Sequence, residues 1–235
     1  MKIEYLFPEH CNLFGDPANI KYLSQCLPTA QIIETHFTEE PRFLTEKVDL
    51  VYMGGMTEDM QEQIAAKLMP YRDRIKELIE EGQVFLVTSN AVELFGTSIT
   101  KNDKTKFDTL NIFDFESRIN FYDRLNSLVL GTYNNLKIIG FKTQFSTMYA
   151  KNFKYPFMNV TRGLGMNKKS SLEGICYRNF FGTYLVGPFL VLNPLFVKHL
   201  LTVMGVENPQ IAHEEAMMDA YQYRLEEFEN PKTKY

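Results

Sequence analysis

The sequence lacks the cysteine patterns of zinc sites and of secreted disulfide frameworks. Its three cysteines form no CxxC pair and no metal-ligand spacing; they are Cys11, Cys26 and Cys176. The N-terminus carries an acidic residue early and has no small-residue cleavage site, so we interpret it as a first strand and not as a signal peptide. An odd number of cysteines without such a signal is typical of the reducing cytoplasm, where we expect the protein. We expect no metal site.

Long apolar runs and an excess of positive charge are also missing. The longest uncharged apolar stretch, residues 182–196, is too short to cross a bilayer and is broken by two prolines. The net charge of −4 argues against general binding to nucleic acids or acidic membranes. The sequence contains neither GxGxxG nor GxxxxGK[ST], so dinucleotide and P-loop sites have no support. We therefore expect no cofactor, no nucleic-acid partner and no membrane insertion.

The first half of the chain alternates strand and helix signals. Strands are expected at residues 1–7, 31–35, 48–53 and 84–88, and helices at residues 18–26 and 58–81. Asp16 and Pro17 are typical of an N-cap and a first helical position. Pro70 interrupts the longer helix, which is therefore either two helices or one kinked helix. This alternation with short connections predicts a parallel α/β sheet.

The second half changes character. From residue 110 to 191, short segments alternate with glycine turn signals, which predicts a strand-rich and partly antiparallel region. Helices are expected at residues 194–204 and 211–228. No glycine- or serine-rich linker divides the chain, and 45% of its residues are hydrophobic, which is ample for a core. We therefore expect residues 1–235 to form a single domain.

Two features follow strands at the edge of the predicted sheet where ligands bind. Gly54 and Gly55 indicate either a turn that needs a positive φ or backbone N–H groups directed at a ligand or oxyanion. Ser89 stands at a sharp strand-to-helix turn of the kind that usually presents a nucleophile. It is a nucleophile, a helix N-cap or a hydrogen-bonding group of a vestigial pocket, and its flanks do not match GxSxG. Taken alone, these residues favour the turn and the cap.

The histidines and aromatic residues are further candidate site residues, but they form no catalytic pattern. His10 stands beside Cys11, but adjacent residues of an extended segment point in opposite directions, which argues against a Cys–His dyad. The remaining histidines show no metal pattern. A dense aromatic region favours core packing with an interaction patch over a stacking surface for a ligand. Its members are Phe113, Phe115, Phe121, Tyr122, Tyr133, Phe141, Phe145, Tyr149, Phe153 and Tyr155.

Four segments together resemble a known family. The residues N-L-F-G-D-P-A-N-I at 12–20 resemble a signature of the glutaminase subunit of lipid II isoglutaminyl synthase. That family lies in the cobyric-acid-synthase-like branch of class I (triad-type) glutamine amidotransferases. Residues 49–63 resemble its glycine-rich turn, residues 82–96 its nucleophile elbow, and residues 173–188 its E-G-x-x-Y-x-N-x-x-G-T-Y-L-H-G-P region. The resemblance implies an α/β fold with a three-layer, mostly parallel flavodoxin-like sheet and additional antiparallel strands.

The sequence differs from this family at the positions of its catalytic residues. The nucleophilic cysteine of the family falls on Ser89, and its catalytic histidine falls on Val186, which cannot accept a proton. A glutamine of the elbow falls on Glu93, and an asparagine and a histidine of a later stretch fall on Thr143 and Gln144. By this resemblance, Ser89 is a vestigial nucleophile position and Val186 a vestigial base position, and no competent catalytic residue is expected.

The sequence also differs from the family pattern around the expected oxyanion hole. The third glycine of the glycine-rich turn falls on Met56, and the two glycines after the nucleophile fall on Asn90 and Ala91. Gly54 and Gly55 are retained. We therefore take Gly54, Gly55, Met56 and Asn90 as candidates for binding a ligand or forming an oxyanion hole.

Three hypotheses follow from this pattern. The first is an amidotransferase-like protein that has lost glutaminase activity and binds a small-molecule ligand or a partner. The second is an enzyme of altered specificity that uses Ser89 for amide or acyl hydrolysis or transfer. The third is a regulatory or scaffolding subunit for a Mur-ligase-like partner in cell-wall precursor amidation, as the resemblance implies. A proton acceptor within hydrogen-bond reach of Ser89 would favour the second hypothesis.

Overall fold

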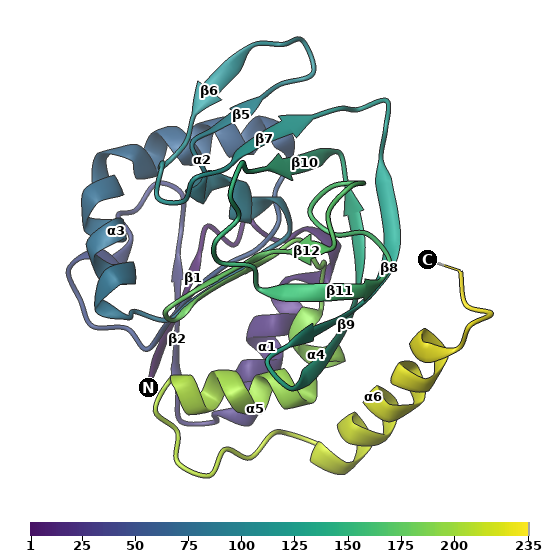
Figure 1. Ribbon diagram of the computed structural model, residues 1–235. Helices are drawn as coiled ribbons and strands as arrows, with labels where there is room; N and C mark the ends of the chain where they lie inside the picture. The colour runs from purple at the N-terminus through teal and green to yellow at the C-terminus, as the bar shows by residue number, and fades with distance from the viewer. Residues whose placement is uncertain (235) are drawn as a thin grey trace.

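A computed structural model describes residues 1–234, which form a mixed α/β protein around a six-stranded sheet (Figure 1). The strand order is β13-β14-β4-β3-β1-β2, and all neighbours pair in parallel except β13 and β14. The strands are β1 (Lys2–Leu6), β2 (Gln31–Thr35), β3 (Leu50–Met53), β4 (Phe85–Thr88), β13 (Ile175–Tyr177) and β14 (Phe180–Thr183). The parallel α/β sheet that the alternating pattern predicts is therefore confirmed, and its central strands β3, β4 and β14 are buried at every residue.

Helices cover both faces of this sheet, which gives three layers (Figure 1). One apolar cluster packs α2 (Glu58–Leu68) and α3 (Arg72–Glu81) on one face, and a second packs α1 (Pro17–Cys26), α4 (Phe189–Leu192) and α5 (Pro194–Val203) on the other. A 3₁₀ turn at Met69–Tyr71 (η3), which contains Pro70, separates α2 from α3, so the interrupted helix of the sequence is two helices. The last helix, α6 (Glu214–Glu229), packs against two strands of the middle of the chain, β8 (Leu125–Tyr133) and β9 (Leu136–Gln144).

The middle of the chain forms two smaller sheets, as its turn signals predict. One has the order β10-β7-β5-β6 and the other β12-β11-β8-β9. Their pairings are antiparallel except for β5 with β7. The strands are β5 (Ser98–Thr100), β6 (Lys106–Asp108), β7 (Glu116–Ile119), β8 (Leu125–Tyr133), β9 (Leu136–Gln144), β10 (Ser146–Tyr149), β11 (Met158–Arg162) and β12 (Leu172–Glu173).

The register of the main sheet brings three segments of the predicted site to one edge. Met53 is paired with Val87, and Thr183 with Thr88, at the carboxyl ends of β3, β4 and β14. The glycine-rich turn, Ser89 and the segment that holds Val186 come directly after these strands. In parallel α/β sheets this is the edge where ligands bind. Three further 3₁₀ helices complete the chain: η1 (Leu13–Gly15), η2 (Arg42–Leu44) and η4 (Ser89–Phe95).

Within residues 1–234, none of the helices combines the length and the apolarity that a membrane span requires.

Candidate functional site

Ser89 forms a strained turn between β4 and η4. Its φ is +59°, a left-handed conformation that a non-glycine residue adopts at an energetic cost and that is frequent at functional sites. Ser89 is the first residue of η4, Thr88 takes the N-cap position, and no side chain caps this helix. The N-cap interpretation of Ser89 is therefore wrong. The backbone has the sharp strand-to-helix turn of a nucleophile elbow.

The glycine-rich turn lies directly against this elbow. A Cβ atom on Gly55 would lie 2.8 Å from Ser89 Oγ, and one on Gly54 would lie 2.6 Å from the carbonyl oxygen of Cys11. Neither glycine has a positive φ. The two positions therefore need glycine because the backbone must approach its neighbours closely, and the interpretation as a positive-φ turn is wrong.

Asp16 fixes the position of this turn from within the protein. Its fully buried carboxylate accepts hydrogen bonds from Gly55 N–H and, at 3.1 Å, from Thr88 Oγ1. Asp16 takes the N-cap position of α1 and Pro17 is its first helical residue, as the sequence predicts, but the Asp16 side chain makes no cap bond to this helix. Burial raises the pKa of Asp16 to about 6, while the bonds from Gly55 and Thr88 oppose this rise. Asp16 thus joins the start of α1, the glycine-rich turn and the end of β4.

This raised pKa predicts a stability change with pH that is specific to Asp16. Because the pKa in the folded state lies above the unfolded value of 3.8, the contribution of Asp16 is fully present below about pH 4 and is lost as the pH rises to about 6. The loss amounts to about 3 kcal/mol. We expect the free energy of unfolding of the wild type, minus that of Asp16→Asn, to fall by this order between pH 4 and 6 and to be flat above. Asparagine keeps an acceptor for Gly55, and denaturant unfolding at each pH measures the difference; a constant difference would contradict the assignment.

The backbone N–H groups nearest the elbow are bonded within the protein. Asn90 Oδ1 accepts a hydrogen bond from Met56 N–H at 3.0 Å, and Asn90 Nδ2 donates to the carbonyl oxygen of Met56 at 2.8 Å. Gly55 N–H donates to Asp16. Two of the candidate oxyanion donors, on Gly55 and Met56, therefore have internal acceptors. A ligand that needed the Met56 N–H would have to displace the side chain of Asn90.

In the part of the chain that the structure describes, no proton acceptor is hydrogen-bonded to Ser89. Among residues 1–234, no side chain or backbone group forms a hydrogen bond with Ser89 Oγ. The buried carboxylate of Glu93, on the same 3₁₀ helix, instead accepts hydrogen bonds from Tyr184 Oη at 2.6 Å and from Gln61 Nε2 at 2.8 Å. Burial raises the pKa of Glu93, which favours its neutral form. Val186 is buried, its N–H donates to the carbonyl oxygen of Phe141, and its side chain offers no proton acceptor.

A small pocket of about 120 Å³ opens at the elbow, and it contains residues that the sequence analysis did not single out. Arg124 and Glu58 line it, beside Ser89 and Gln144. The guanidinium of Arg124 lies 4.8 Å from the centroid of the Phe145 ring. Burial raises the pKa of Glu58, and the charge of Arg124 opposes this. Arg124 lies outside the family motifs, and Glu58 lies within residues 49–63 but at a position to which the sequence analysis gave no role, so no spacing signal linked the two.

One polar atom in this pocket has no partner. The side-chain oxygen Oε1 of Gln144 is buried without a hydrogen bond from any described residue, while Gln144 Nε2 donates to Ser146 O. A buried acceptor without a donor costs free energy. No histidine lines the pocket, and within residues 1–234 no three His, Cys, Asp or Glu side chains come together as metal ligands. Cys176 lies on β13, where its thiol contacts Tyr133, away from the elbow.

The comparison with known proteins settles the family. Residues 2–194 match the CobB/CobQ-like glutamine amidotransferase domain. The chain belongs to this family. It is 28% identical over 205 residues to the GatD subunit of lipid II isoglutaminyl synthase (glutamine-hydrolyzing) of Staphylococcus aureus (strain N315), over 86% of this chain and 83% of that subunit. It is 24% identical over 217 residues to the GatD subunit of Streptococcus pneumoniae (strain ATCC BAA-255 / R6), over 86% of this chain and 79% of that subunit. The resemblance read from the motifs is thereby confirmed.

Solved structures of glutamine amidotransferases have the same fold. One glutamine amidotransferase aligns with a TM-score of 0.57 at 12% identity, over 86% of this chain and 99% of the other. A glutamine amidotransferase from Thermotoga maritima aligns with a TM-score of 0.53 at 12% identity, over 96% and 97% of the two chains. At these identities the likeness concerns the fold, and it confirms the predicted amidotransferase-type α/β architecture.

Proposed function

We propose that this amidotransferase-like protein has lost glutaminase activity and acts by binding, as a regulatory or scaffolding subunit for a Mur-ligase-like partner in the amidation of cell-wall precursors. The proposal takes residues 1–235 as one domain and the cytoplasm as its location. The observation that carries it is the elbow itself: Ser89 keeps the turn, yet its hydroxyl has no hydrogen-bond partner among residues 1–234, and Val186 stands at the position of the base. The similarity to subunits of a two-part synthase supports the choice of partner.

The chemistry of amide hydrolysis supports the loss of activity. A nucleophile must lose its proton before or during attack, and a serine hydroxyl without an adjacent base is a weak nucleophile. The developing oxyanion also needs preorganised donors, and the N–H of Met56 is bonded to Asn90. Nucleophile, base and oxyanion donor are thus all altered at one site. The loss of such groups costs several orders of magnitude in rate.

The retained pocket supports a binding role. Arg124, Glu58 and Gln144 line a space of about 120 Å³, and the buried Oε1 of Gln144 has no hydrogen-bond partner among the described residues. These groups suit a small polar ligand with both a negative and a positive end. No histidine lines the pocket, and none of the described residues is hydrogen-bonded to Ser89 Oγ, so binding without turnover is the function that its chemistry favours.

One observation favours the second candidate, an enzyme of altered specificity. The φ of +59° at Ser89 is a strain that a purely structural turn could relieve with glycine. The hydrogen bonds of Glu93 argue against this candidate, because its carboxylate interacts with Tyr184 and Gln61 and not with Ser89. Because no described residue accepts a hydrogen bond from Ser89 Oγ, the elbow alone gives no route for acyl transfer.

Co-expression with the Mur-ligase-like protein of the same organism tests the proposed role. We expect the two purified chains to elute together in size-exclusion chromatography, and the Ser89→Ala variant to elute with the partner equally well, because the role needs no nucleophile. Separate elution of the wild type and the ligase at micromolar concentrations would contradict the partner. Complex formation that depends on Ser89 would contradict a role independent of the nucleophile.

A further inference from the structure

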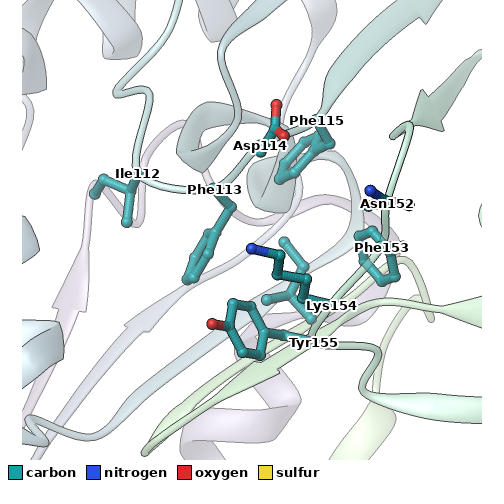
Figure 2. Close-up of a pocket in the computed structure, with 9 residues that line it drawn as sticks. Ile112, Phe113, Asp114, Phe115, Asn152, Phe153, Lys154 and Tyr155 are labelled. Carbon is teal, nitrogen blue, oxygen red and sulfur yellow. The ribbon is translucent and has the colours of Figure 1, made fainter.

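A second cavity, of about 190 Å³, lies between residues 112–115 and residues 152–155, and it shares no lining residue with the pocket at Ser89. Figure 2 shows Phe113, Phe115 and Phe153 around it, with Lys154 and Tyr155 on the side opposite Phe115. Ile175, a buried residue of edge strand β13, also lines it. The cavity thus belongs to the aromatic-rich middle of the chain, to which the proposed function assigns no role.

The walls of this cavity are held on both sides by the fold. The N–H of Phe113 donates to the carbonyl oxygen of Phe95 at 2.9 Å, and the Phe113 ring packs on Phe180 with a centroid separation of 5.0 Å. On the other side, Cys176 N–H donates to the carbonyl oxygen of Tyr155 at 2.9 Å. These contacts keep the apolar walls apart without a ligand, which is typical of a preformed binding site.

One charged group points into this apolar space. In Figure 2 the amino group of Lys154 is directed toward the middle of the cavity, between Phe113 and Phe115. Lys154 forms no ion pair and no side-chain hydrogen bond with the residues that the structure describes. Lys154 is exposed to solvent, so an anion can reach its amino group while an apolar body enters the space between the rings. The cavity therefore combines apolar walls with a single unpaired positive charge.

We propose that this cavity binds a small monoanion with a flat apolar body, of the size of an aryl carboxylate. An engineered apolar cavity of about 150 Å³ accepts benzene, so 190 Å³ leaves room for a ring and one small further group. The carboxylate pairs with Lys154 while the ring packs against Phe113 and Phe115. Asp114 at the rim, which is exposed and likewise forms no ion pair within residues 1–234, disfavours a second negative charge on the ligand. This site does not depend on the proposed function.

Titration with phenylacetate, followed by protein NMR or calorimetry, tests the site, with phenylacetamide as the uncharged analogue of the same shape. We expect saturable binding of phenylacetate, weakened about fivefold in Lys154→Gln, because the ion pair with an exposed lysine is lost. Phenylacetamide binding should change less than about twofold in the same variant. Asp114→Asn should tighten phenylacetate binding by a few-fold, because it removes a repulsive charge.

Two control variants separate this site from its surroundings. Lys151→Gln removes an exposed lysine from the same segment that does not line the cavity, and it should leave phenylacetate binding unchanged. Ser89→Ala should also leave it unchanged, which distinguishes this cavity from the elbow pocket. The proposal is overturned if phenylacetate shows no saturable binding up to about 10 mM. It is equally overturned if Lys154→Gln and Lys151→Gln bind phenylacetate alike, or if binding is lost in Ser89→Ala.

Discussion

Replacing Lys142 by methionine is expected to lower the free energy of unfolding by about 3–5 kcal/mol. Lys142, on β9, is 1% exposed, and its Nζ lies 3.4 Å from Glu173 Oε1 and donates to the carbonyl oxygen of Gly165 at 2.9 Å. Methionine has a similar volume but no charge, so the fully buried carboxylate of Glu173 would lose its only cationic neighbour among the described ion pairs. An uncompensated buried charge is among the largest single destabilising effects known in proteins.

Chemical denaturation of matched variants measures this effect. Lys137 lies on the same strand, but it is half-exposed and pairs with Glu229 at the surface, so Lys137→Met should change stability by less than about 0.5 kcal/mol. The double variant Lys142→Met/Glu173→Gln removes both charges and should be more stable than Lys142→Met alone. Equal stabilities of Lys142→Met and Lys137→Met would show that the buried pair contributes nothing.

The second large effect concerns the chemistry of the elbow. Ser89→Cys alone is expected to give no glutaminase activity above background, because Val186 supplies no base and Met56 N–H is bonded to Asn90. In the triple variant Ser89→Cys/Val186→His/Asn90→Gly, all three groups are restored. We expect this triple variant to hydrolyse glutamine about 10²–10³-fold faster than Ser89→Cys/Val186→His, because it frees one oxyanion donor.

Ammonia release under saturating glutamine measures each variant in this series, and circular dichroism confirms that each is folded. The order of the effects is the informative result. Activity in Ser89→Cys alone would mean that an unrecognised base serves the elbow. Equal rates of the double and triple variants would mean that the Asn90–Met56 pair does not obstruct the reaction.

Local sequence patterns predicted the strands and helices well because these elements depend mainly on apolar periodicity. The fully buried runs at β3 and β4 and the stop at Gly82, which has a φ of +89°, are such signals. Asp16 shows where local reasoning fails. It has the sequence position of an N-cap, yet its carboxylate accepts a hydrogen bond from Gly55, which is 39 residues away. Asp16 makes this long-range contact in place of a side-chain cap bond, and no local sequence pattern encodes such a contact.

In the candidate site too, some features follow from sequence motifs and others depend on long-range packing. The family motifs placed Ser89, Gly55 and Asn90 at one edge of the sheet, and the structure brings these three residues together. The pocket also contains Arg124, directly before β8, and Glu58, the first residue of α2. Their meeting depends on how the smaller sheets pack over the main sheet, which has no signature in residue spacing. The positive φ of Ser89 is likewise a property of the folded turn and not of the residue type.

The most direct test of the account is ammonia release from saturating glutamine by the wild type and by Ser89→Ala, each alone and mixed with the Mur-ligase-like partner. We predict that the wild type and Ser89→Ala release ammonia at the same rate as a protein-free control in all cases. Release by the wild type that disappears in Ser89→Ala would show that Ser89 is a working nucleophile and would contradict the loss of glutaminase chemistry.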